Sequence, residues 1–127
     1  QDLGRYAEAA ELLESALRSD EGNFGADHPS TARSQSNLAL VYQDLGRYAK
    51  AAELLESSLR SAERNYGADH PSTAIRQSNL AGVYVDLGRV QEAKSLSKQS
   101  IITFEKVFGP NHPNTINEKK WLDNLEE

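Results

Sequence analysis

The fold is decided by a stretch of 42 residues that occurs twice in succession. Residues 1–42 read QDLGRYAEAAELLESALRSDEGNFGADHPSTARSQSNLALVY, and residues 43–84 read QDLGRYAKAAELLESSLRSAERNYGADHPSTAIRQSNLAGVY. The two copies agree at 34 of 42 positions, and residues 85–126 repeat the pattern more weakly, with 13 identities to the second copy. A fixed period of this length is typical of solenoids and propellers, in which each unit stabilises its neighbours.

The spacing of apolar residues inside one copy indicates helices. Apolar and small side chains recur at steps of three and four between Tyr48 and Tyr66, which places them on one face of a helix. Gly67 follows as a left-handed terminator, and Pro71 suits the first turn of a second helix, which Asp69 or Ser72 could cap. No stretch alternates in the manner of a strand. Each 42-residue unit is therefore predicted to be a helical hairpin.

We name the helix after His-Pro helix A and the helix after Leu-Gly-Arg helix B. Six helices are predicted, three of each kind, at residues 5–21, 30–44, 47–65, 72–86, 89–107 and 113–125. Residues 1–127 are expected to be one fragment of a longer array, cut out of phase with its hairpins. Its parts would be helix B of a truncated repeat, two complete repeats and a final helix A, over residues 1–28, 29–70, 71–112 and 113–127.

These units resemble the tetratricopeptide repeat (TPR). Two successive units supply its signature of Leu, small residue, aromatic, Gly and Ala, at Leu38, Ala39, Tyr42, Gly46, Tyr48, Ala51 and at Leu80, Ala81, Tyr84, Gly88, Ala93. The second unit departs from the signature at Val90, where Tyr is usual. The usual repeat has about 34 residues, and this longer form with a Gly-x-Asp-His-Pro loop resembles the repeats of kinesin light chains. The resemblance implies an all-α, right-handed superhelical solenoid of antiparallel hairpins.

Composition and charge exclude several classes of function. The chain has 127 residues, a formal net charge of −5 and no Cys, which excludes disulfide scaffolds, zinc–thiolate sites and thiol catalysis. The acidic balance disfavours nucleic acid as a partner, and no apolar run approaches the roughly 20 residues that span a bilayer. These features predict a cytoplasmic module that binds neither nucleic acid nor membrane.

Residues that often carry chemistry are expected to be structural here. His28, His70 and His112 recur at equivalent loop positions, and equivalent positions in stacked repeats cannot converge on one metal ion. The many glutamates lie among Lys and Arg in the pattern of a solvated helix face. Lys119 and Lys120 beside Trp121 are too few charges for a nucleic-acid surface, and Trp121 is expected to cover the end of the array. We predict no catalytic residues, no bound metal, no cofactor and no enzymatic activity.

The resemblance also implies a concave groove, lined by the A helices, that accepts a peptide or a helix of another protein. The residues expected to face it are Arg33, Ser36, Asn37, Leu40, Gln43, Ile75, Ser78, Asn79, Gly82, Val85, Asn117, Lys120, Trp121 and Asn124. A carboxamide both donates and accepts hydrogen bonds, so Asn37 and Asn79 suit a peptide backbone. Alternatively, they bond to a neighbouring helix and only brace the stack.

The differences between the two near-identical copies favour a binding role. Of eight differences, Arg33/Ile75 and Leu40/Gly82 fall at groove positions, and Ser34/Arg76 lies beside them. Gly82 in mid-helix costs about 1 kcal/mol relative to Ala, so it is expected to make room for a ligand or an adjacent helix. Arg33 and Lys120 favour some acidic ligand residues, whereas the net charge disfavours strongly acidic partners.

The leading hypothesis is a non-catalytic protein–protein interaction module. Two alternatives remain open. The chain could be a structural scaffold or spacer that associates with itself through apolar array ends, for example through Leu3, Tyr6, Leu12 and Leu13. It could also be the regulatory sensor of a larger multidomain protein.

Overall fold

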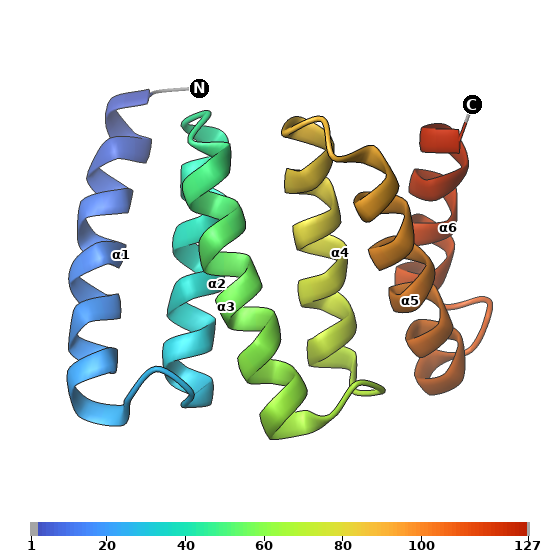
Figure 1. Ribbon diagram of the computed structural model, residues 1–127, viewed down its shortest axis with the longest axis horizontal. Coiled ribbons are helices and arrows are strands. Elements are labelled where there is room, and N and C mark those ends of the chain that lie inside the picture. The colour runs from blue at the N-terminus through green and yellow to red at the C-terminus, as the bar shows by residue number, and fades with distance from the viewer. Residues whose placement is uncertain (1–2, 127) are drawn as a thin grey trace. The chain divides into compact units, whose positions relative to one another are not determined.

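The computed structural model describes residues 3–126, and Figure 1 shows that they form helices joined by short loops. The helices are α1 (Leu3–Phe24), α2 (Pro29–Asp44), α3 (Tyr48–Tyr66), α4 (Pro71–Asp86), α5 (Val90–Phe108) and α6 (Pro113–Glu126). Each boundary lies within three residues of its predicted position, and the all-α prediction is confirmed. None of these helices within residues 3–126 combines the length and the apolar character needed to cross a membrane.

The chain divides into two compact units, Gln1–Asn65 and Tyr66–Glu127. In the first unit, α1 packs against α2, and α2 is joined to α3 by a hydrogen bond of 2.8 Å from Ser58 Oγ to the carbonyl oxygen of Ala32. In the second unit, α5 packs against both α4 and α6. The A helices are α2, α4 and α6, and the B helices are α1, α3 and α5.

Each A helix begins at a histidine that caps its first turn. The Nδ1 atom of His70 accepts a hydrogen bond from the backbone N–H of Ser72 at 3.0 Å, and His28 and His112 accept the equivalent bond at 3.1 Å. The sequence had suggested Asp69 or Ser72 as the cap, and the structure corrects this to His70. A histidine can serve because an unprotonated ring nitrogen satisfies an exposed helix N–H as a Ser or Asp oxygen does.

The loop before each A helix is held by the same contacts in all three copies. The His70 ring stacks on Tyr66, the last residue of α3, and the centroid distances of the three equivalent stacks are between 4.3 and 4.6 Å. The hydroxyl of Thr73 donates a hydrogen bond of 2.7 Å to the carbonyl of Gly67. The Gly-x-Asp-His-Pro loop therefore fixes where each A helix starts, and the three histidines have a structural role.

The turn from helix A to helix B depends on one glycine. Gly46 and Gly88 have φ angles of +78° and +80°. This left-handed backbone conformation costs free energy for residues that have a Cβ atom. This turn brings the N–H of Arg47 within 2.8 Å of the carbonyl of Tyr42 and closes the end of α2. The glycine of the repeat signature is therefore a requirement of the backbone.

The core is built from small side chains. Ala39, Ala51, Ala81 and Ala93, the small residues of the repeat signature, are all 0% exposed. Buried hydroxyl groups such as that of Ser58 accompany them and donate to backbone carbonyls. Helices that bury alanine and serine can approach closely, so each hairpin is thin and presents much of its surface to solvent.

Candidate functional site

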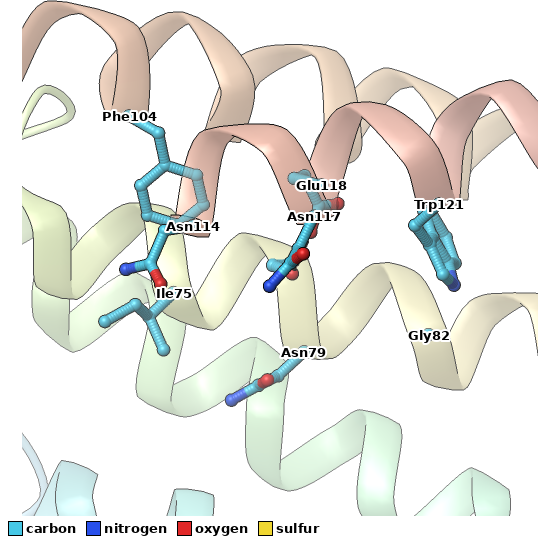
Figure 2. A pocket seen from close by; sticks show the side chains of 9 residues that line it. Ile75, Asn79, Gly82, Phe104, Asn114, Asn117, Glu118 and Trp121 are labelled. Atoms are coloured by element: carbon cyan, nitrogen blue, oxygen red, sulfur yellow. Dashed lines mark hydrogen bonds between the residues drawn. The ribbon is translucent and has the colours of Figure 1, made fainter. Parts of the chain in front are cut away.

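The second unit contains an open hollow between α4 and α6, with a volume of about 510 Å³. Helix α4 and helix α6 provide its sides, and Phe104 of α5 lies at the end near Ile75 and Asn114 (Figure 2). Nine residues line it: Ile75, Ser78, Asn79, Gly82, Phe104, Asn114, Asn117, Glu118 and Trp121. Six of these nine were predicted from the sequence as groove residues.

At one end of the hollow, the large side chain of Trp121 lies opposite a glycine. Figure 2 shows Trp121 extending from α6 toward the turn of α4 that carries Gly82. Both residues are half-buried and both line the hollow. The residue equivalent to Gly82 in the first unit is Leu40, which is 42% exposed. Gly82 has no side chain, so none extends from this turn of α4 toward Trp121.

The middle of the hollow carries carboxamide groups. Asn79 on α4 and Asn114 and Asn117 on α6 all line it, and Figure 2 shows them projecting into the space between the two helices. Among residues 3–126, the structure shows no hydrogen-bond partner for the side chains of Asn79 and Asn117. These amide groups can therefore both donate to and accept from a bound molecule.

A buried carboxylate lies beside these amides. Glu118 on α6 is only 8% exposed, yet it lines the hollow. Its two oxygens accept hydrogen bonds from the hydroxyls of Ser78 on α4 at 2.5 Å and Ser97 on α5 at 2.7 Å. The groove residue Ser78 is thus already engaged, since it helps to hold Glu118 in place.

The sequence comparisons agree with this architecture. The model of the tetratricopeptide repeat family matches residues 1–64 and residues 35–101. The chain belongs to the tetratricopeptide repeat family. Among proteins with curated descriptions, none matches this sequence.

The TPR chain is also similar to solved structures of long repeats. A crystal structure of nearly identical TPR-like repeats from Podosopora anserina, described as kinesin-light-chain repeats, is 33% identical with a TM-score of 0.90. The alignment covers 96% of this chain and 58% of the Podosopora chain. A single-substitution variant of that structure is 32% identical, with a TM-score of 0.90, and its alignment covers 96% of this chain and 57% of the variant. The TPR is therefore of the kinesin-light-chain-like kind.

A third structure shows the fold alone. The crystal structure of BtubC (BKLC) from P. vanneervenii is 20% identical, with a TM-score of 0.88, and covers 96% of this chain and 49% of that chain. The TPR chain thus spans less than two thirds of the length of each of these three structures.

Other groove residues predicted for this TPR lie outside the hollow. Val85 is half-buried, and Lys120 and Asn124 are exposed on α6, but none of them is among the lining residues. Trp121, expected to cover the end of the array, lines the hollow and is half-buried there. Adjacent positions on one helix therefore differ in whether they reach the hollow.

The five groove residues predicted in the first unit are all on α2. Arg33, Asn37 and Leu40 are exposed, Gln43 is half-buried and Ser36 is buried. Like Asn79, the Asn37 side chain shows no hydrogen-bond partner among residues 3–126. The structure therefore offers no helix-bracing contact for either asparagine of the two Ser-Asn-Leu-Ala segments within this part of the chain.

Three residues of the hollow were not predicted. Phe104 belongs to a B helix, and Asn114 stands in the first turn of α6, so a prediction confined to the inner face of the A helices misses both. Glu118 occupies the repeat position of Ser34 and Arg76, where the two near-identical copies differ. That variation beside the predicted groove was the one signal that could have identified it.

A smaller hollow in the first unit has a different character. It has a volume of about 380 Å³ and is lined by Glu14, Leu17, Arg18, Leu38, Tyr42, Lys50, Glu53 and Leu54. The hydroxyl of Tyr42 donates a hydrogen bond to the carboxylate of Glu14. Burial, and then this bond, raise the pKa of Tyr42 above its ordinary value. The Tyr42–Glu14 pair joins α2 to α1 across this hollow and acts as a brace between the two helices.

Proposed function

We propose that this TPR chain is a non-catalytic interaction module and that a segment of a partner protein binds in the hollow between α4 and α6. The observation that carries the proposal is a pair of carboxamides, Asn79 and Asn117, that have no hydrogen-bond partner among residues 3–126 and lie in an open hollow that ends at Trp121 and Gly82. TPR domains typically bind proteins or peptides.

The size and chemistry of the hollow support this proposal. Its volume of about 510 Å³ lies within the range of roughly 300–1,000 Å³ usual for ligand sites. The amides can pair with the N–H and C=O groups of a peptide regardless of its sequence. Ile75, Phe104 and Trp121 supply apolar surface for a partner side chain.

The lining also favours binding over catalysis. Glu118 is the one titratable side chain among the nine lining residues, and both of its oxygens already accept hydroxyl hydrogen bonds. General acid–base chemistry and nucleophilic catalysis need a second group within hydrogen-bond reach of the reacting atoms. No such pair is present among the lining residues in the described part of the chain.

The proposal is tested by selecting peptides from a random phage-displayed library with the folded chain as bait. Binding of the selected peptides is then measured by calorimetry and by the fluorescence of Trp121, the only tryptophan of the chain. We expect Asn79→Ala and Asn117→Ala each to weaken binding about three- to tenfold, the worth of one hydrogen bond. Peptide binding should also change the Trp121 emission.

A matched control lies on the same helix. Asn124→Ala removes an exposed carboxamide of α6 that does not line the hollow, so it should leave affinity unchanged. Circular dichroism establishes that all variants are folded. Selected peptides that bind equally well to the unmodified chain, to Asn79→Ala and to Asn117→Ala would contradict the proposal, as would light scattering that shows only self-association of the chain.

A further inference from the structure

The hollow contains a carboxylate that has no cationic partner in the described part of the chain. Glu118 is 8% exposed, and its contacts within residues 3–126 are the hydroxyls of Ser78 and Ser97. A buried carboxylate is costly unless hydrogen bonds or an opposite charge compensate it. Each carboxylate oxygen has two acceptor positions, so the two hydroxyls leave capacity for donors that arrive from the hollow.

Among the described residues, none of Lys98, Lys119 and Lys120 pairs with Glu118. Lys119 Nζ lies 2.5 Å from Glu105 Oε2, and Lys98 Nζ lies 3.8 Å from Glu126 Oε2. Lys120 is exposed and is not a lining residue. No Lys, Arg or His of the described residues lines the hollow. Its local charge is therefore negative, on a chain whose formal net charge is −5.

The group next to Glu118 on the helix is an aromatic ring. Trp121 follows Glu118 by three residues, a spacing that brings two side chains of a helix to the same face. A guanidinium attracted to a carboxylate can also lie on the face of an indole, which is the best aromatic partner for a cation. Gly82 lies opposite Trp121 on α4 and has no side chain that would occupy the space between them.

On these grounds we propose that the hollow selects an arginine of the partner segment. Its guanidinium would bind Glu118 and stack on Trp121, while the oxygens of Asn79 and Asn117 accept its remaining N–H groups. Arginine fits better than lysine because its planar group stacks on a ring and presents five donors. This inference rests on the proposed function. It specifies a basic residue of the partner, because Glu118 would repel an acidic one.

The test uses two small probes and the unmodified chain. N-acetyl-arginine methylamide and N-acetyl-citrulline methylamide have nearly the same shape, but citrulline carries no charge. The indole N–H resonance of Trp121 is a single NMR signal, because the chain has one tryptophan. We expect the arginine probe to shift this signal saturably, with an affinity at least fivefold greater than that of the citrulline probe and reduced by added salt.

A variant localises the effect to Glu118. In Glu118→Gln the shape is kept and the charge is lost, so the two probes should bind alike. Glu63→Gln, a change of the same kind at an exposed site of α3, should leave the arginine preference intact. Equal binding of the two probes to the unmodified chain would overturn the inference without any variant, as would an arginine preference that persists in Glu118→Gln.

The outcome is separable from that of the proposed function. Library peptides that bind in a manner sensitive to Asn79→Ala, but that show no enrichment of arginine and no loss on Arg→Gln substitution, would overturn this inference and leave the proposed function standing. The absence of any peptide binding at the hollow would overturn both.

Discussion

The same kind of joint, between a B helix and the A helix that follows it, occurs in both units with opposite polarity. In the first unit, the hydroxyl of Ser34 on α2 donates to the carboxylate of Asp20 on α1. In the second unit, the carboxylate is Glu118 on α6, and a hydroxyl donor is Ser97 on α5. The framework tolerates either arrangement because a hydroxyl–carboxylate hydrogen bond satisfies both groups.

The two joints differ in whether the carboxylate lies on helix B or on helix A. An acid on helix B, as at Asp20, is turned toward its neighbouring helix. An acid on helix A, as at Glu118, also borders the hollow. The repeat position of Asp20 is taken by Phe104, which is 4% exposed and lines that hollow. Three positions therefore differ between the structural contact and the candidate binding surface: Ser34 is replaced by Glu118, Asp20 by Phe104 and Leu13 by Ser97.

The largest effect is expected from the residue that replaces Asp20 in the second unit. Phe104→Ala removes a buried ring and should lower the free energy of unfolding by about 3–5 kcal/mol. Asp20→Ala at the equivalent position should cost less than about 1.5 kcal/mol, since it removes one half-buried hydrogen bond. Urea unfolding followed by Trp121 fluorescence and by circular dichroism measures both. Equal losses would show that the two joints are energetically the same.

A smaller effect is expected from the two polar pairs themselves. Glu118→Ala leaves the hydroxyl of Ser97, which is 0% exposed, without its acceptor. It should cost about 1–3 kcal/mol, whereas Ser34→Ala should cost about 0.5–1.5 kcal/mol. The same urea experiment applies. Glu118→Gln retains a hydrogen-bonding group, so it should recover most of the loss, and a failure to do so would indicate that the charge itself stabilises the second unit.

The brace of the first unit should be sensitive to alkaline pH. The pKa of Tyr42 is raised in the folded chain by burial and by its bond to Glu14, so the folded state holds the phenol proton more tightly than the unfolded state. Its stabilising contribution is complete below the ordinary tyrosine pKa of about 10 and is lost as pH rises above it. Thermal unfolding from pH 8 to 11 should show this loss, and Tyr42→Phe should reduce it.

The smallest effect is expected at two equivalent surface ion pairs. Arg64 pairs with Asp27 in the first unit, and Lys106 pairs with Asp69 at 3.2 Å in the second. All four side chains are more than half exposed. Arg64→Ala and Lys106→Ala should each change stability by less than about 1 kcal/mol. A larger loss in one unit would reveal a difference that the repeated sequence conceals.

The structure of each hairpin could be predicted from local signals alone. The local signals were the steps of three and four between Tyr48 and Tyr66, the turn at Gly46 and the helix start at Pro71. With their equivalents in the other copies, they predicted the ends of every helix to within three residues. The near-identity of two copies gave the repeat, and its signature gave the family. These features act over a few residues or repeat at a fixed period, so they can be read without coordinates.

The candidate site could be predicted only in part. The helical positions of Asn79, Gly82 and Trp121 predict one face, and all three line the same hollow. It could not separate Trp121 from Lys120 and Asn124, because the inclusion of a side chain depends on how the neighbouring helix packs. The histidine caps were missed for a different reason, since Asp and Ser are the more common N-cap residues.

The sequence by itself therefore determined the secondary structure, the repeat and the family of this protein. Only the tertiary structure decided which side chains share the hollow. Glu118 is joined to Ser78, 40 residues away, and to Ser97, 21 residues away. The physical reason is that a helical period fixes the face on which a side chain lies. The burial of that side chain and its hydrogen-bond partner depend instead on which residue of another helix lies opposite.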